Sequence, residues 1–311
     1  MTPAIDLLAG RLGDRGVRDA PLGERTTYRV GGPAALLVEV GDDRSLRALA
    51  AATRGLEVPV LVLGRGSNLL VADAGFPGVV VHLTGAFEAL TISGIRVEAG
   101  GAVSLPVLAR RTVAEGLRGL EWAVGVPGSV GGAVRMNAGG HGSDVAACLE
   151  QAVVVDLRSG ACEPWAPSSL DLRYRGSALR DWQIVVGATF RTEPGDAEAG
   201  AALVEEIVRW RRANQPGGQN SGSVFTNPPG DAAGRLVEAA GAKGLRIGTA
   251  EVSIKHANFI QADPGGSAAD VASVIAEARR MVAEVHGVDL RPEVRLVGFG
   301  ADVVAATGAR S

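Results

Sequence analysis

The sequence predicts an α+β fold, and three patterns lead to this prediction. Over the first 190 residues, short runs rich in valine, leucine and isoleucine alternate with glycines, as is typical of strands joined by tight turns. Only two helical segments interrupt these runs, at about 45–54 and 105–115. After the polar stretch 193–196, helical periodicity replaces the strand pattern.

The individual elements follow from local signals. The helix at 105–115 has Ser104 as its cap, Pro106 in its first turn and Gly116 as its stop. Residues 197–212 carry apolar side chains at helical spacing, and the longest helix is predicted at 268–286, behind a capping box formed by Ser267 and Asp270. Strands are expected at 35–40, 58–63, 69–72, 79–83, 95–99, 152–156, 184–192 and 290–297.

The change of pattern at 193–196 predicts a domain boundary. We expect a lead-in helix at 1–22, a first domain at 23–192, a second domain at 197–300 and a tail at 301–311. A chain of 311 residues is long enough for two such domains.

Composition excludes several classes of protein. The net charge is −3, from 31 basic and 34 acidic residues, and no run of like charge marks a nucleic-acid or membrane partner. No targeting segment or apolar run of membrane-spanning length is present, so we expect a cytoplasmic protein. Cys148 and Cys162 do not form a Cys-x-x-Cys pair, which argues against a disulfide framework, and the four histidines lack the spacing of metal ligands.

A first glycine-rich loop, at 64–68, connects two predicted strands. A dinucleotide fingerprint needs a third glycine and a following helix, and an NTPase phosphate loop needs Gly-Lys-Ser/Thr, so neither applies here. Gly64 and Gly66 still permit positive φ, which would aim successive main-chain N–H groups at a pyrophosphate, while Ser67 and Asn68 would add side-chain donors. A plain hairpin turn is the structural alternative.

A second loop, at 125–133, favours the ligand-binding interpretation. It contains four glycines in nine residues, and a further glycine pair follows at 139–140. Each glycine costs roughly 0.5–1 kcal/mol of ordering entropy relative to alanine, so packing alone seldom requires so many. A large flat ligand that contacts main chain explains the stretch better.

These loops belong to a longer series of motifs that resembles the UDP-N-acetylenolpyruvoylglucosamine reductase family. The resemblance spans about 25–298. The motifs that carry it, in chain order, are Thr27 to Pro33, Gly64 to Leu69, Pro127 to Ala133, Tyr174-Arg175, Ser221 to Pro228, Lys255 to Phe259 and Pro292 to Arg295.

The resemblance implies an FAD-binding domain of the p-cresol methylhydroxylase and vanillyl-alcohol oxidase type, followed by a smaller α/β substrate-binding domain. It implies non-covalent FAD, NADPH as hydride donor, and reduction of the enolpyruvyl ether of a UDP-sugar to UDP-N-acetylmuramate for peptidoglycan. The connection from Arg191 to the helix at 197 is short, without an inserted tyrosine-bearing loop, so the chain resembles the loopless second type. We expect a monomer.

The resemblance also implies roles for individual residues. Ser223 matches the proton donor, and Arg175 and Glu293 match the pair at the substrate carboxylate. The sequence departs from the family pattern at Thr226 and Asn214, where many relatives have lysine, which leaves the diphosphate contacts least secure. Substrate contacts are expected at Tyr174, Asn227, Lys255 and Arg295, and FAD contacts at Gly64, Arg65, Gly66, Ser67, Asn68, Leu69, Gly128, Ser129, Gly131, Gly132 and Ala133.

The chemistry of these residue types agrees with those roles. An arginine fork stabilises negative charge that builds on a carboxylate, and a serine can protonate a strongly basic, carbanion-like centre. A strand at 290–297 would place Glu293 and Arg295 on one face. Read locally, each has a structural alternative: Arg175 as a surface side chain, Ser223 as a hydroxyl that caps a loop, and the Glu293 face as a solvated surface.

Two other functions remain open from the residues. A flavin oxidase of the same superfamily commonly carries histidine or cysteine at the attachment loop, and 64–68 contains neither. A UDP-sugar sensor would keep the fold without turnover, which the intact Arg175, Ser223 and Glu293 make less favoured.

Overall fold

The computed structural model describes residues 3–309 and separates into two compact units. The first unit comprises the residues up to Arg18 together with Leu36–Arg65 and Gly78–Arg211. The second comprises Asp19–Ala35, Gly66–Pro77 and the residues from Arg212 on. The chain therefore passes from one unit to the other several times.

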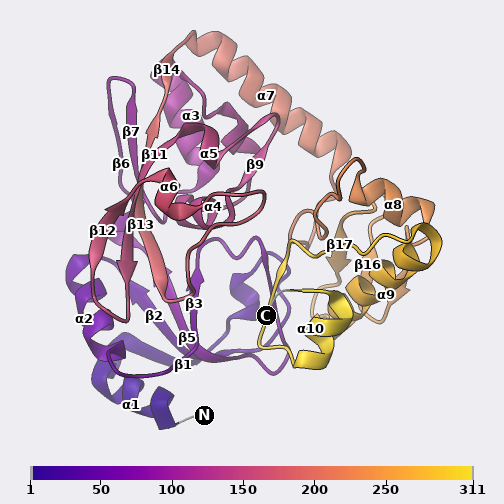
Figure 1. Cartoon of the computed structure of the whole chain (residues 1–311), viewed down its shortest axis with the longest axis horizontal. Helices are drawn as coiled ribbons and strands as arrows, with labels where there is room; N and C mark the ends of the chain where they lie inside the picture. Colours follow the sequence, from indigo (N-terminus) through magenta and orange to yellow (C-terminus); the bar gives the residue numbers. More distant parts are fainter. Residues whose placement is uncertain (1–2, 310–311) are drawn as a thin grey trace. The chain divides into compact units, whose positions relative to one another are not determined.

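The centre of the first unit is an antiparallel five-stranded sheet in the order β12-β11-β13-β7-β6. Helix α4 (Val130–Met136) packs against β13, and α3 (Leu105–Ala114) adds an apolar face that contributes Leu105, Leu108 and Val113 to the core (Figure 1). The strands are β6 (Leu90–Ser93), β7 (Arg96–Gly100), β11 (Leu149–Asp156), β12 (Cys162–Trp165) and β13 (Gln183–Arg191).

A second, four-stranded sheet has the order β1-β2-β5-β3. Strands β3 (Val60–Leu63) and β5 (Phe76–Leu83) pair in parallel, while β1 is Gly16–Ala20 and β2 is Ala34–Val40. Helix α2 (Asp43–Thr53) begins at a capping box between Asp42 and Ser45.

The second unit is organised around α9 (Ala268–His286), which buries Val271, Val274 and Ile275 and contacts α8 (Ala233–Ala239) and α10 (Ala301–Thr307) (Figure 1). A three-stranded sheet of β15 (Arg246–Ile247), β16 (Ala250–Val252) and β17 (Ile260–Ala262) packs on α9. Strand β4 (Leu69–Val71) pairs in parallel with β18 (Arg295–Val297).

The remaining elements complete the fold. They are α1 (Pro3–Leu12), α5 (Val145–Cys148), α6 (Pro167–Leu170), α7 (Ala197–Asn214), β8 (Leu117–Arg118), β9 (Gly139–Gly140), β10 (Ser143–Asp144), β14 (Glu193–Pro194) and the 3₁₀ turns Gly13–Arg15, Gly23–Arg25, Gly85–Glu88 and Glu121–Gly125.

The structure differs from the sequence-based expectations at the two ends of the described chain. The helix expected at 1–22 ends at Leu12, because Gly13 takes a φ of +57°, and the chain continues into β1. The segment expected to be a tail at 301–311 contains α10, with residues 310–311 outside the described part.

Two internal expectations also need correction. The strand expected at 290–297 begins only at Arg295, because Pro292 has no N–H and Glu293 donates its own N–H to Val224 O at 2.7 Å. The compact units do not follow a single boundary at 193–196, since residues 19–35 and 66–77 group with the C-terminal part and Glu193–Pro194 forms β14 against β8.

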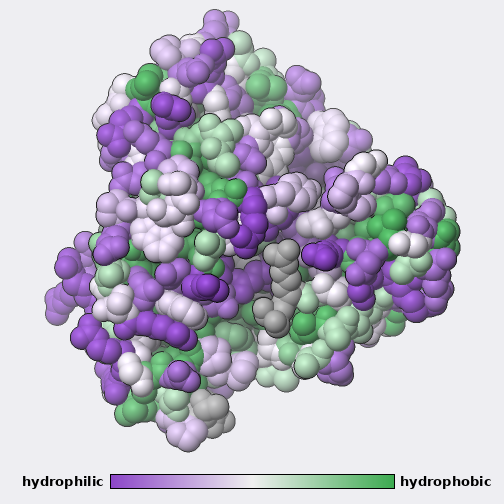
Figure 2. All heavy atoms as spheres, in the orientation of Figure 1, coloured by the Kyte–Doolittle hydropathy of each residue, from purple (hydrophilic) through white to green (hydrophobic). Residues whose placement is uncertain are grey.

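Surface character is mixed on the face drawn in Figure 2, where hydrophilic and hydrophobic side chains are interspersed. Within residues 3–309, no helix combines the length and the apolar character that crossing a membrane requires.

Candidate active site

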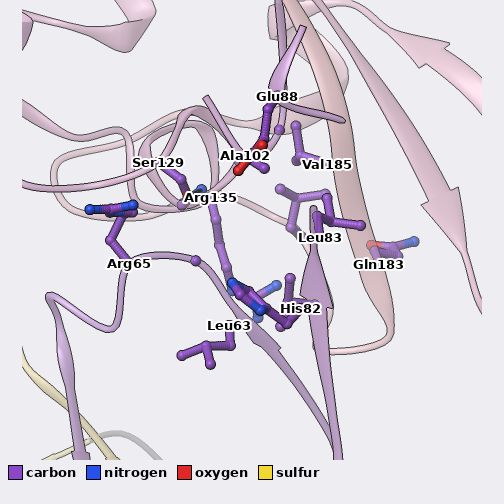
Figure 3. A pocket seen from close by; sticks show the side chains of 16 residues that line it. Leu63, Arg65, His82, Leu83, Glu88, Ala102, Ser129, Arg135, Gln183 and Val185 are labelled. Carbon is purple, nitrogen blue, oxygen red and sulfur yellow. Dashed lines mark hydrogen bonds between the residues drawn. The ribbon is translucent and has the colours of Figure 1, made fainter. Parts of the chain in front are cut away.

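A cavity in the first unit contains residues from both glycine-rich loops. Its cavity volume is about 70 Å³, and it opens to solvent. Figure 3 shows Leu63, Arg65, His82, Glu88, Ser129 and Arg135 among the side chains that line it. Of the eleven residues predicted to contact FAD, the lining includes Gly64, Arg65, Ser129, Gly131 and Gly132.

The two loops approach each other closely at Gly64 and Ser129. A Cβ on Gly64 would lie 2.3 Å from the Ser129 hydroxyl oxygen. Ser129 is the N-cap of α4 and accepts from Gly132 N at 3.4 Å. The bare backbone of residue 64 therefore borders both the cavity and the start of a helix.

The first loop presents main-chain donors that the protein itself does not use. Among residues 3–309, none of the N–H groups of residues 64–68 donates a hydrogen bond to another residue. Buried or half-buried N–H groups are nearly always paired, so a run of such donors is typical of an anion-binding loop. The loop is not a hairpin, because β3 pairs with β5 whereas β4 pairs with β18.

The second loop continues into a helix. Residues 130–136 form helix α4, in which Val130 N donates to Val103 O at 2.9 Å and Gly131 N to Gly101 O at 2.8 Å. These N–H groups are therefore satisfied by protein. Gly131 is required for close packing, since a Cβ there would lie 2.9 Å from Val185 O.

The other six residues expected to contact FAD do not line the cavity, namely Gly66, Ser67, Asn68, Leu69, Gly128 and Ala133. Ala133 is 2% exposed in the core of the first unit, and Gly128 accepts from Leu105 N at 2.9 Å. Leu69 lies in β4 and is 8% exposed. The lining instead includes residues that the sequence analysis missed, namely Val62, His82, Glu88, Ala102, Arg135 and Gln183.

Arg175 lies at the tip of a tight turn in the first unit. Arg173 and Gly176 exchange two main-chain hydrogen bonds of 3.0 Å, so Tyr174 and Arg175 are the two central residues. Arg175 has a φ of +56°, an unfavourable conformation for a residue with a Cβ, and its guanidinium carbon lies 5.2 Å from the Tyr174 ring centroid. Such strain is characteristic of functional sites.

Helix α4 connects this turn to the cavity. At its C-terminal end, Arg135 O accepts from the Ser177 hydroxyl at 2.7 Å, and Asn137 Nδ2 donates to Arg173 O at 3.3 Å. Seven residues of α-helix span about 10 Å, with Ser129 at the other end. The turn and the cavity are thus held at a fixed separation within one unit.

Ser223 and Glu293 come together in the second unit. Glu293 N bonds to Val224 O, the residue after Ser223, at 2.7 Å. Asn68 Nδ2 donates to Glu293 O at 3.1 Å, and Arg295 N donates to Asn68 O at 3.1 Å. The first glycine loop, the predicted proton donor and the predicted acidic residue are therefore adjacent main-chain segments.

Asn258 fixes this arrangement and was missed as a site residue. It is 4% exposed, its Oδ1 accepts from Phe225 N and its Nδ2 donates to Phe225 O, both at 2.9 Å. Its own carbonyl accepts from Val224 N at 2.8 Å. The sequence signal that could have identified Asn258 is a polar residue between two apolar ones, Ala257 and Phe259, both of which are buried.

The remaining predicted substrate contacts lie at the surface of the same unit. Asn227 is exposed, and its Oδ1 accepts from Ala233 N at the start of α8. Lys255 is exposed, and its ammonium donates to Arg212 O at 2.6 Å. Thr226, which stands where relatives have lysine, donates to Arg291 O at 3.2 Å. Within residues 3–309, no group of histidine, cysteine and acidic side chains could hold a metal ion.

Two protein-family models match the chain. The family described as "FAD binding domain" matches residues 34–163, and the family described as "UDP-N-acetylenolpyruvoylglucosamine reductase, C-terminal domain" matches residues 213–297. These matches, together with the mixed helices and strands, confirm the predicted α+β class and the order of an FAD-binding domain followed by a C-terminal domain.

Similar full-length proteins extend the likeness to nearly the whole chain. The chain is 41% identical to UDP-N-acetylenolpyruvoylglucosamine reductase 2 of Symbiobacterium thermophilum, over 96% of this chain and 98% of that protein. It is 43% identical to the reductase of the same name from Heliobacterium modesticaldum, over 91% and 90%. The crystal structure of the reductase from Thermus caldophilus superposes with a TM-score of 0.79 at 36% identity, over 91% of this chain and 98% of that one.

Proposed function

Because the chain belongs to the UDP-N-acetylenolpyruvoylglucosamine reductase family, we propose that it uses NADPH to reduce the enolpyruvyl ether of this UDP-sugar. The product would be UDP-N-acetylmuramate, a precursor of peptidoglycan. The main-chain adjacency of the Ser223 turn, Glu293 and the glycine loop at 64–68 is the observation that best supports the proposal. It gathers a proton donor, an acid and the Asn68 end of the glycine loop in one unit.

The residues of the first loop fit FAD. Its main-chain N–H groups suit a pyrophosphate. A Cβ at Gly64 would lie against Ser129, where both residues line the cavity. The loop contains no histidine or cysteine, which supports non-covalent binding. With FAD bound there, the site would gain the means to pass hydride from NADPH to the enolpyruvyl carbon.

Arg175 binds the carboxylate of the substrate in this proposal. Its planar fork forms two parallel charge-assisted hydrogen bonds, and its position at a two-residue turn fixes the direction of the fork. Negative charge grows on that carboxylate after hydride transfer, so the arginine stabilises the reacting state more than the ground state. A single preorganised donor of this kind contributes roughly 3 kcal/mol in comparable sites.

Ser223 donates a proton to the carbon next to the carboxylate. It follows Gly222, whose φ is +79°, and precedes Val224, which is bonded to Asn258 and Glu293. A serine is a weak acid, so this transfer is restricted to the strongly basic centre that follows hydride addition. Glu293 contributes to the polar network that orients the carboxylate.

We also propose that the protein is a cytoplasmic monomer of the loopless second type. NADPH and the UDP-sugar both carry charged diphosphates that do not cross membranes unaided, which supports a cytoplasmic reaction. Exposed large hydrophobic side chains are dispersed over several elements, which supports a monomer. The absence of a tyrosine-bearing insertion between β14 and α7 supports the loopless second type.

An NADPH oxidation assay with and without the enolpyruvyl UDP-sugar tests the function. We expect oxidation that depends on the sugar, and a product that takes up one deuterium from heavy water at the carbon next to the carboxylate. Oxygen consumption with a sugar or alcohol substrate instead would indicate an oxidase. Sugar binding without turnover would indicate a sensor.

A further inference from the structure

Tyr28 is a completely buried tyrosine whose hydroxyl lies near that of Ser221. Its exposed fraction is 0%, and its ring belongs to the same apolar cluster as Val224 and Phe225, directly after Ser223. Burial raises the pKa of Tyr28 to about 12, and the nearby Ser221 hydroxyl offsets part of that rise. The phenol therefore keeps its proton at any working pH and acts as a hydrogen-bond donor.

Neither hydroxyl completes a hydrogen bond of good geometry with another residue in the range 3–309. Tyr28 Oη and Ser221 Oγ are both inaccessible to solvent, and Ser221 is only 7% exposed. Buried hydroxyls are rarely left in this state. Catalytic hydrogen bonds are often long or misaligned without substrate and tighten when it binds.

The location of Ser221 gives the pair a direct influence on the predicted proton donor. Only Gly222 separates Ser221 from Ser223. Gly222 has a left-handed φ of +79°, and it has no side chain that could restrain the main chain. On the other side of Ser223, the main chain is fixed by Asn258 and Glu293. Before Ser223, Gly222 N donates to Asn220 Oδ1 at 3.0 Å, and the Ser221 hydroxyl is a second group that can restrain this approach.

The other end of Tyr28 is attached to the glycine loop. Thr27 N, one residue earlier, donates to Gly66 O at 3.0 Å. Gly66 packs so closely on this segment that a Cβ would lie 2.3 Å from Arg25 O. The tyrosine segment therefore connects Gly66 of the first glycine loop with the turn that carries Ser223, all within the second unit.

We infer that Tyr28 and Ser221 are positioning residues for Ser223: a hydrogen bond between their hydroxyls in the substrate complex sets the Ser221–Ser223 turn, so that the Ser223 hydroxyl meets the substrate carbon. This inference rests on the proposed function of Ser223. It assigns no proton transfer to Tyr28, because a fully enclosed phenol has no route to solvent.

The test separates the two half-reactions of the FAD-loaded protein in a stopped-flow experiment. Tyr28→Phe and Ser221→Ala should be bleached by NADPH within about twofold of the wild-type rate. Reoxidation by the enolpyruvyl UDP-sugar should slow about tenfold in each, with a larger solvent deuterium isotope effect because proton transfer becomes more rate-limiting. Tyr28→Phe/Ser221→Ala should also be slowed about tenfold, not a hundredfold, since both substitutions remove one interaction.

Controls distinguish this pair from general destabilisation. Thr307→Val removes another completely buried hydroxyl of the second unit, one that bonds only within α10, and should leave both half-reactions unchanged. Wild-type reoxidation in both single variants, multiplicative losses in the double variant, or equal slowing of both half-reactions would each overturn the inference. Ser221→Ala alone decides the matter if Tyr28→Phe does not fold. Normal reoxidation in Ser223→Ala would refute the proposed role of Ser223 instead, whatever the pair does.

Discussion

Substituting Gly66 by alanine tests whether the first glycine loop holds FAD. Gly66 has a φ of +62°, where a side chain costs about 1–2 kcal/mol. Its Cβ would lie 2.3 Å from Arg25 O and 2.6 Å from Thr26 Cα, both main-chain atoms that cannot rotate away. Ordinary contact needs about 3.5 Å, so the loop must move by about 1 Å.

That movement also affects the hydrogen bond from Thr27 N to Gly66 O, which is worth about 1 kcal/mol. We therefore expect Gly66→Ala to lose about 2–3 kcal/mol of stability and most of its flavin. Gly55→Ala is the matched control, because Gly55 has a φ of +73° but no atom within 4 Å of the added Cβ. It should lose only the conformational term of about 1–2 kcal/mol and remain yellow.

Flavin absorbance per protein after gel filtration measures the first effect, and urea unfolding measures the second. Gly66→Val should be colourless, since branching at Cβ resists positive φ further. Full flavin occupancy in Gly66→Ala, with a stability equal to that of Gly55→Ala, would show that the loop does not hold the cofactor.

Three other predictions follow from individual residues. Arg175→Lys should lose most activity in steady-state assays although the charge is kept, because an ammonium cannot form a bidentate fork, and a near-normal rate would place Arg175 away from the carboxylate. Ser223→Ala should still be bleached by NADPH but be reoxidised by the sugar about 10²–10⁴-fold more slowly, and an unchanged rate with deuterium uptake would identify another donor. Hydrogen bonds from Thr249 N and Oγ1 lower the pKa of Asp270, so its contribution to stability is present above the ordinary value of 3.8 and is lost as pH falls through the lowered value. Thermal melting should show that Asp270→Asn is less stable than wild type at neutral pH and that the difference shrinks in acid; a constant difference at every pH would contradict this.

The elements that the sequence predicts correctly are those whose signal is local. Helix α9 runs over 268–286 as its capping serine and its apolar stripe indicate, and Gly287 ends it with a φ of +66°. Strands β2, β3 and β5 were likewise expected within a few residues of their ends. In each case, the spacing of apolar side chains and a terminating residue are enough to determine the element.

The elements that the sequence does not predict depend on distant partners. Strand β18 is short because Glu293 N bonds to Val224, about seventy residues earlier in the chain. Its pairing strand, β4, lies more than two hundred residues away in the sequence. Helix α4 forms in a glycine-rich stretch because Ser129 caps it and main-chain carbonyls of the 101–103 turn accept its first N–H groups. No local pattern contains that information.

The same distinction separates the predicted site residues from the missed ones. Motif residues such as Ser223 and Glu293 can be selected along the sequence because their chemistry is explicit, but their adjacency depends on Asn68 and Asn258, whose side chains bond to main chain across 225 and 33 residues. The glycines of the two loops look alike in the sequence, yet none of the N–H groups of residues 64–68 has a protein acceptor within the described chain, whereas those of Val130 and Gly131 are already bonded. A glycine count therefore indicates that main chain is approached closely, and only the hydrogen-bond partners decide whether a ligand or the protein itself makes that approach.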